Sequence, residues 1–151
     1  MAEGEAVVTT TRQVESTVIN CKADMLWAKF RDQKWDELLP ERVQSVTWGE
    51  GGPHQIGATF TITYTDGSVW TYCVTEISDP GRLITTEVLA SEPALHVHSV
   101  INSIKVRRVT STDQAFVTWT TDFSNDVTAE IIADNKYKKI DAFETLASHF
   151  P

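Results

Sequence analysis

Residues 58–77 read ATFTITYTDGSVWTYCVTEI, and in this stretch bulky side chains alternate with small or polar ones, mostly threonine, on either side of a short polar turn. Alternation with a period of two is typical of a β-strand with one buried face. The sequence Thr65-Asp-Gly67 supplies residues that favour a tight turn. The stretch therefore predicts two antiparallel strands, at 58–64 and 69–77, whose large side chains lie on one face: Phe60, Ile62 and Tyr64, then Trp70, Tyr72 and Val74.

The same alternation continues on both sides of this hairpin. A β-branched segment before it and several segments around it predict further strands, at 13–21, 43–48, 83–89, 96–109 and 115–123. The connections contain glycine, proline or small polar residues, which are typical of turns. We therefore expect a strongly curved, seven-stranded antiparallel sheet.

Helical spacing occurs only near the two ends of the chain. The apolar residues of 23–30 predict a short helix, and a second helical turn at 35–39 ends before Pro40 because proline lacks the backbone donor. Residues 127–150 contain no glycine or proline and carry apolar side chains at steps of three and four, which predicts one long amphipathic helix. Asn125 or Asp126 is the expected N-cap of this helix.

The order β-αα-ββββββ-α indicates an α+β fold in which a curved sheet wraps on a long C-terminal helix. A single helix laid across such a sheet can cover its inner face without filling the space beneath. The alternating aromatic side chains suit a cavity for a mostly apolar molecule, since tyrosine and tryptophan combine an apolar ring with a polar group. The same alternation suits a filled core, and the sequence leaves both interpretations open.

Composition indicates one globular domain and excludes some partners. The chain has 151 residues, 41% hydrophobic and 23% charged, so we expect a single domain at 13–151 preceded by a flexible arm at 1–12. A net charge of −8 opposes binding to nucleic acid and to anionic membranes. The chain has no apolar run of spanning length and an acidic start, so we expect a cytoplasmic protein, monomeric or weakly dimeric, that does not insert into membranes. Cys21 and Cys73 are expected to be reduced.

Several short motifs carry a resemblance to a known superfamily. The order of elements, the turn Gly49-Glu-Gly-Gly-Pro53 and the sequence Tyr64-Thr-Asp-Gly67 leading into Trp70 resemble the Bet v 1-like, START-related (SRPBCC) superfamily. Within it, residues 18–123 are most similar to the polyketide cyclase/dehydrase group, above all at Ile77-Ser-Asp-Pro-Gly-Arg-Leu83 and Phe116-Val-Thr-Trp119. The resemblance covers nearly the whole chain after the arm.

This resemblance implies a helix-grip fold with a hydrophobic ligand cavity. Matching the Asp66-Gly67 turn to the superfamily implies that Ile62, Tyr64, Trp70 and Tyr72 line the cavity. Together with the alternation pattern, it gives a set of expected ligand-binding residues: Trp27, Phe60, Ile62, Tyr64, Trp70, Tyr72, Val74, Trp119, Tyr137 and Ile140. The superfamily has diverse functions, so the fold alone does not define an activity.

Titratable residues offer a candidate acid/base pair. Glu87 and His98 would face each other across a hairpin centred near Pro93, and two such groups in a cavity can exchange a proton. A solvated cross-strand ion pair is the alternative. His96 and His98 are spaced to share a strand face, but no third ligand accompanies them, so we predict no metal and no cofactor.

Two further motifs, one rich in glycine and one rich in lysine, have structural rather than functional interpretations. The turn at 49–53 is followed by a strand and has no Gly-Lys-Ser/Thr, so it is a loop at a sheet corner rather than a phosphate site. Lys136, Lys138 and Lys139 are interpreted as a solvated helix face.

Three functions remain open on this basis. The leading hypothesis is a binding or carrier protein for a small hydrophobic molecule, such as a lipid, a polyketide or another aromatic or isoprenoid metabolite. The first alternative is a cofactor-free cyclase, dehydratase or isomerase that uses Glu87 and His98. The second alternative is a protein-interaction module.

Overall fold

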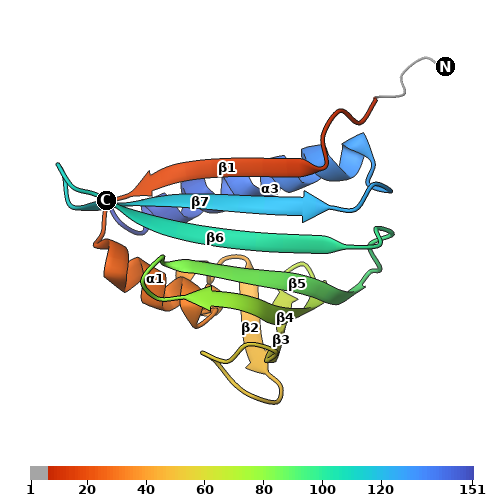
Figure 1. Ribbon diagram of the computed structural model, residues 1–151, viewed down its shortest axis with the longest axis horizontal. Helices are drawn as coiled ribbons and strands as arrows, with labels where there is room; N and C mark the ends of the chain where they lie inside the picture. The colour runs from red at the N-terminus through yellow and green to blue at the C-terminus, as the bar shows by residue number, and fades with distance from the viewer. Residues whose placement is uncertain (1–6) are drawn as a thin grey trace.

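The computed structural model describes residues 7–151 and contains, in that range, seven strands and three helices in the expected order (Figure 1). Residues 1–6 of the predicted arm lie outside the described residues, and 7–11 precede the first strand. The elements are β1 (Arg12–Ile19), α1 (Ala23–Arg31), α2 (Trp35–Leu38), β2 (Val43–Trp48), β3 (Thr59–Tyr64), β4 (Val69–Ser78), β5 (Leu83–Glu92), β6 (Val100–Val109), β7 (Gln114–Phe123) and α3 (Ala129–Ser148).

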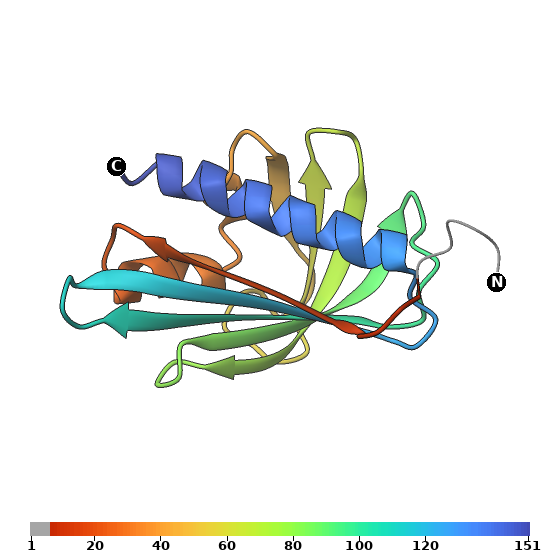
Figure 2. The same ribbon diagram turned by 90° about the horizontal axis from the view of Figure 1, so that it is seen from above.

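The seven strands form one antiparallel sheet in the order β1-β7-β6-β5-β4-β3-β2. Strands β2 to β7 follow one another as hairpins, and β1 joins the far edge by pairing with β7. Helix α3 lies along one face of the curved sheet, as the two views in Figures 1 and 2 show. The α+β helix-grip fold expected from the sequence is confirmed.

The core lies where the inner face of the sheet meets the three helices. In β7 the side chains of Ala115 and Val117 are fully buried, and the period of two places Trp119 and Thr121 on the same face. Helix α3 contributes Phe143, whose ring centroid lies 5.9 Å from that of Trp119 in an edge-on arrangement. The long helix is therefore attached to the middle of β7 by aromatic packing.

The N-cap of α3 differs from the expected one. Thr128 caps the helix, and its Oγ1 accepts a hydrogen bond of 3.2 Å from the backbone N–H of Ile131. Asp126 instead accepts a hydrogen bond of 2.8 Å from the backbone N–H of His98. The prediction of Asn125 or Asp126 was wrong because Asp126 fixes the loop before β6 and the helix begins two residues later.

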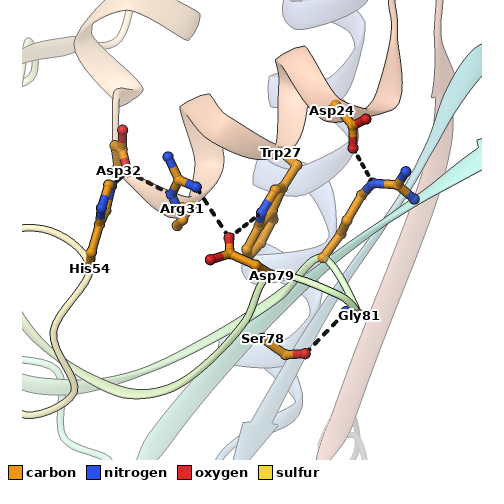
Figure 3. A network of polar contacts seen from close by, with 9 residues as sticks. Asp24, Trp27, Arg31, Asp32, His54, Ser78, Asp79 and Gly81 are labelled. Atoms are coloured by element: carbon orange, nitrogen blue, oxygen red, sulfur yellow. Dashed lines mark hydrogen bonds and ion pairs between the residues drawn. The ribbon is translucent and has the colours of Figure 1, made fainter.

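Polar contacts attach α1 to two loops of the sheet (Figure 3). The indole Nε1 of Trp27 donates to Asp79 at 2.9 Å, and Arg31 donates to the same carboxylate at 3.1 Å. Arg31 also donates to Asp32 at 3.0 Å, and Asp32 pairs with His54 in the loop between β2 and β3. The Ser-Asp-Pro-Gly segment and the glycine-rich loop, both noted in the sequence, therefore hold α1 in place.

We expect the replacement of Asp79 by alanine to lower the melting temperature at pH 7, because it leaves the buried Trp27 N–H without its partner. Hydrogen bonds from Trp27 and Arg31 lower the pKa of Asp79 below its usual value. The stabilisation by this carboxylate is therefore present above about pH 4 and is lost as the pH falls through the folded-state pKa. Thermal unfolding of Asp79→Ala and of the unmodified protein at pH 7 and pH 3 measures this stabilisation. The difference between their melting temperatures should be smaller at pH 3.

The matched control is Asp36→Ala, which removes an exposed carboxylate from α2. This role for Asp79 would be contradicted if both variants lowered the melting temperature equally. It would also be contradicted if the melting temperatures of Asp79→Ala and the unmodified protein differed by the same amount at both pH values.

Candidate functional site

A cavity of about 390 Å³ lies between the inner face of the sheet and α3. This volume is within the range of small-molecule sites, roughly 300–1,000 Å³. Most of its wall is apolar or aromatic and comes from β3 to β7, α2 and α3, including Trp35, Phe60, Ile62, Tyr72, Ile84, Ile104 and Trp119. Of the two interpretations that the sequence left open, the structure has the cavity.

Cross-strand aromatic pairs form one wall of the cavity. Phe60 on β3 stands opposite Tyr72 on β4, and their rings stack with centroids 5.1 Å apart. Ile62 stands opposite Trp70, whose ring stacks on Tyr72 at 6.4 Å. This continuous aromatic surface follows from the alternation in residues 58–77 together with the register of the hairpin.

Two tyrosine hydroxyl groups meet at the cavity wall. The Oη atoms of Tyr64 and Tyr72 lie 3.2 Å apart. Burial raises the pKa of both phenols, that of Tyr72 well above its ordinary value, so both remain protonated near neutral pH. One hydrogen bond within the pair uses one of the two protons. The other O–H is therefore available to donate to a bound molecule.

Asn102 on β6 presents a second group of donors to the cavity. Its Oδ1 accepts hydrogen bonds from Trp119 Nε1 at 3.3 Å and from Thr121 Oγ1 at 2.7 Å. These two donors fix the orientation of the amide. Its Nδ2 group makes no hydrogen bond to any residue from 7 to 151, so its N–H donors remain available in a residue that lines the cavity.

Lys139 on α3 is buried, which corrects its assignment to a solvated face. Only 1% of its surface is exposed, and its Nζ donates to the backbone carbonyl of Gln13 at 2.9 Å. Burial lowers the pKa of Lys139 to about 7, an effect partly opposed by the charges of Glu15 and Asp122. Helical spacing contained the missed signal, since Lys139 lies four positions before the buried Phe143 and shares its face.

Exposed polar residues mark where the cavity meets solvent. Asp66 follows β3, while Asp134 and Lys138 lie on α3, and all three are both exposed and part of the cavity wall. Nearby on the same helix, Asn135 Oδ1 is buried and has no hydrogen-bond partner among residues 7–151. The mostly apolar wall of the cavity therefore also contains several polar residues, both exposed and buried.

The structure brings six of the ten predicted ligand-binding residues to the cavity wall: Phe60, Ile62, Tyr64, Trp70, Tyr72 and Trp119. The other four lie elsewhere. Trp27 and Val74 are buried in the solid part of the core, and Tyr137 is 67% exposed on the outer side of α3. Ile140 contributes to a separate, smaller depression between β1 and α3. A binding role for the six remains a prediction.

The predicted pairing of Glu87 with His98 is wrong. Glu87 stands opposite Ile101, and β6 begins at Val100 rather than at residue 96. His96 and His98 therefore lie in the connecting loop and not on a strand. Neither Glu87 nor His98 lines the cavity. Residues 93–99 form a longer loop than the symmetric hairpin that the sequence suggested, and this removes the acid/base pair.

Within residues 7–151, no cluster of three or more histidine, cysteine or acidic side chains has a geometry suited to a metal ion. Cys21 and Cys73 are free thiols. No helix in this range is both long and apolar enough to cross a membrane.

Comparison with solved structures identifies the fold. No protein-family model and no curated protein sequence matches the chain. A protein from Nitrosospira multiformis has a TM-score of 0.79 and 17% identity, covering 93% of this chain and 96% of that one. Major latex-like protein 151 from Panax ginseng has a TM-score of 0.73 and 16% identity, covering 93% and 97%. Ara h 8.0201 has a TM-score of 0.72 and 15% identity, covering 92% and 96%. The chain therefore has the Bet v 1-like helix-grip fold.

Proposed function

We propose that the protein binds one small, largely apolar molecule in the cavity between the sheet and α3, and serves as a carrier or binding protein for it. The observation that supports this most strongly is the cavity of about 390 Å³ with its aromatic wall. Burying roughly 300 Å² of apolar ligand surface contributes about 7 kcal/mol before the costs of association. A net affinity of 1 μM corresponds to about 8.2 kcal/mol, so aromatic stacking and polar contacts must add to this contribution.

The lining favours ligands with flat or branched hydrocarbon parts and few polar groups. Stacked rings at Phe60, Trp70 and Tyr72 offer an extended aromatic surface, and the free tyrosine O–H can orient one ligand oxygen. A lipid, a polyketide or another aromatic or isoprenoid metabolite satisfies these requirements. The resemblance to the polyketide cyclase/dehydrase group supports the same classes.

A side chain that fills the cavity should abolish binding without unfolding the protein. Thr86 on β5 lines the cavity, and a phenylalanine at this position would occupy the ligand's space. We expect Thr86→Phe to weaken the binding of N-phenyl-1-naphthylamine, a neutral apolar fluorescent probe, at least tenfold. A fluorescence titration measures the affinity, and thermal unfolding confirms that the variant is folded.

The matched control is Thr47→Phe, which adds the same side chain on the exposed side of β2. It should bind the probe as the unmodified protein does. Equal affinity in Thr86→Phe and the unmodified protein would overturn the proposed site, and no binding by the unmodified protein would overturn the proposed function.

A further inference from the structure

We propose that the ligand is an acid, and that its carboxylate binds between Lys139 of α3 and Asn102 of β6. This rests on the proposed function and defines the chemical class of its ligand. One residue comes from the helix and the other from the sheet, and both lie beside the Trp119 indole, which places the polar end of the ligand where helix and sheet meet.

The Lys139 ammonium has donors that the protein leaves free. Of its three N–H groups, one is used by the carbonyl of Gln13, and no other hydrogen bond to Nζ forms within residues 7–151. Its Nζ also lies 5.7 Å from the centroid of the Trp119 ring, at cation–π distance. A buried cation is costly unless it is paired, so this position favours an anion supplied by a ligand.

Asn102 provides the second donor near the same indole. Trp119 contacts Lys139 through its ring and donates to Asn102 through Nε1, so the ammonium and the amide flank one side chain. The amide orientation is fixed because Oδ1 accepts from both Trp119 and Thr121. A carboxylate accepts several hydrogen bonds and can bind the Nζ and Nδ2 groups together.

The other charges around Lys139 are already engaged. Glu15 on β1 accepts from Gln13 Nε2 at 2.8 Å, and Asp122 on β7 pairs with Arg12 at 2.8 Å. The remaining charged residues of the cavity wall lie nearer its exposed part: Lys138 pairs with Asp134 at 2.9 Å, Arg42 pairs with Asp141, and Asp66 accepts from Ser68. Among residues 7–151, Lys139 is therefore the cation of the cavity wall without a carboxylate partner.

Several contacts stabilise the ammonium form of Lys139 and partly oppose the effect of burial. A carbonyl acceptor, an indole face and two nearby carboxylates all stabilise positive charge on Nζ. A ligand carboxylate would add one more contact of this kind, so the geometry points to ion pairing.

Binding of an acid should be accompanied by proton uptake. With a pKa of about 7, Lys139 is about half protonated at pH 7 in the empty protein. A bound carboxylate favours the charged form. We therefore expect an uptake of about 0.5 proton per bound acid at pH 7 and about 0.9 at pH 8, and none for a neutral ligand.

The test is isothermal titration calorimetry with decanoate and decanol, each in buffers of different ionisation enthalpy. Lys139→Met should bind decanoate at least tenfold more weakly than the unmodified protein and take up no proton, while its affinity for decanol is unchanged. Lys136→Met removes an exposed lysine of the same helix and should behave as the unmodified protein.

Two outcomes separate this inference from the proposed function. Equal decanoate affinity in Lys139→Met and the unmodified protein, or no proton uptake by the latter, would overturn the carboxylate site while decanol binding supports the cavity. Failure of both decanoate and decanol to bind the unmodified protein would overturn the proposed function together with the inference.

Discussion

Replacing Phe143 with alanine is expected to lower the free energy of unfolding by about 3–5 kcal/mol. Phe143 is 6% exposed and packs against Trp119, so it attaches α3 to the middle of β7. The substitution removes a large apolar side chain and leaves a void next to Trp119. Chemical denaturation with urea measures the loss.

Tyr137→Ala on the same helix is the control for this prediction. Tyr137 is 67% exposed, so the change in unfolding free energy should stay within about 0.5 kcal/mol. Similar losses in Phe143→Ala and Tyr137→Ala would mean that α3 is not held by its inner face, which would contradict the packing described above.

The second large effect is a dependence of stability on pH caused by Lys139. Its folded-state pKa of about 7 lies below the value of about 10.4 for an unfolded chain, because burial disfavours the charge. Between these values the unfolded chain binds more protons than the folded protein, so stability rises with pH. From pH 7 to pH 9, the unmodified protein should gain about 2 kcal/mol relative to Lys139→Met.

Urea unfolding of both proteins at pH 7, 8 and 9 measures this difference, and contributions from other groups cancel in the comparison. A difference between the two proteins that stays constant over this range would show that the Lys139 ammonium is not destabilised by burial. The sequence-based assignment of Lys139 to solvent would then be the better one.

Much of the fold could be predicted from local patterns. The alternation in residues 43–48 and 58–77 reflects which side chains are buried. The strands β2, β3 and β4 begin and end within one residue of the positions that this alternation predicts. The long run without glycine or proline likewise predicted α3. Such patterns are local in sequence, and they depend little on how the strands pair.

The candidate site was harder to predict from the sequence, because it depends on the register of the strands and on which face of each helix is buried. Glu87 and His98 were paired on the assumption of a symmetric hairpin, but the loop at 93–99 shifts Ile101 opposite Glu87. Trp27 is of a residue type that is common in ligand cavities, yet its indole N–H donates to Asp79 outside the cavity. Lys139 was grouped with its charged neighbours although its helical position is that of the apolar stripe. The type of each residue did not by itself indicate whether its side chain faces the cavity, the core or solvent.

Native mass spectrometry shows whether the cavity holds one small apolar molecule. The unmodified protein and Thr86→Phe would be purified from the protein's own cells, and their masses compared before and after denaturation. We predict one bound small molecule per chain in the unmodified protein and none in Thr86→Phe. The same bound mass in both proteins would contradict ligand binding in this cavity. An unmodified protein that carries no bound small molecule, even after incubation with N-phenyl-1-naphthylamine, would contradict it as well.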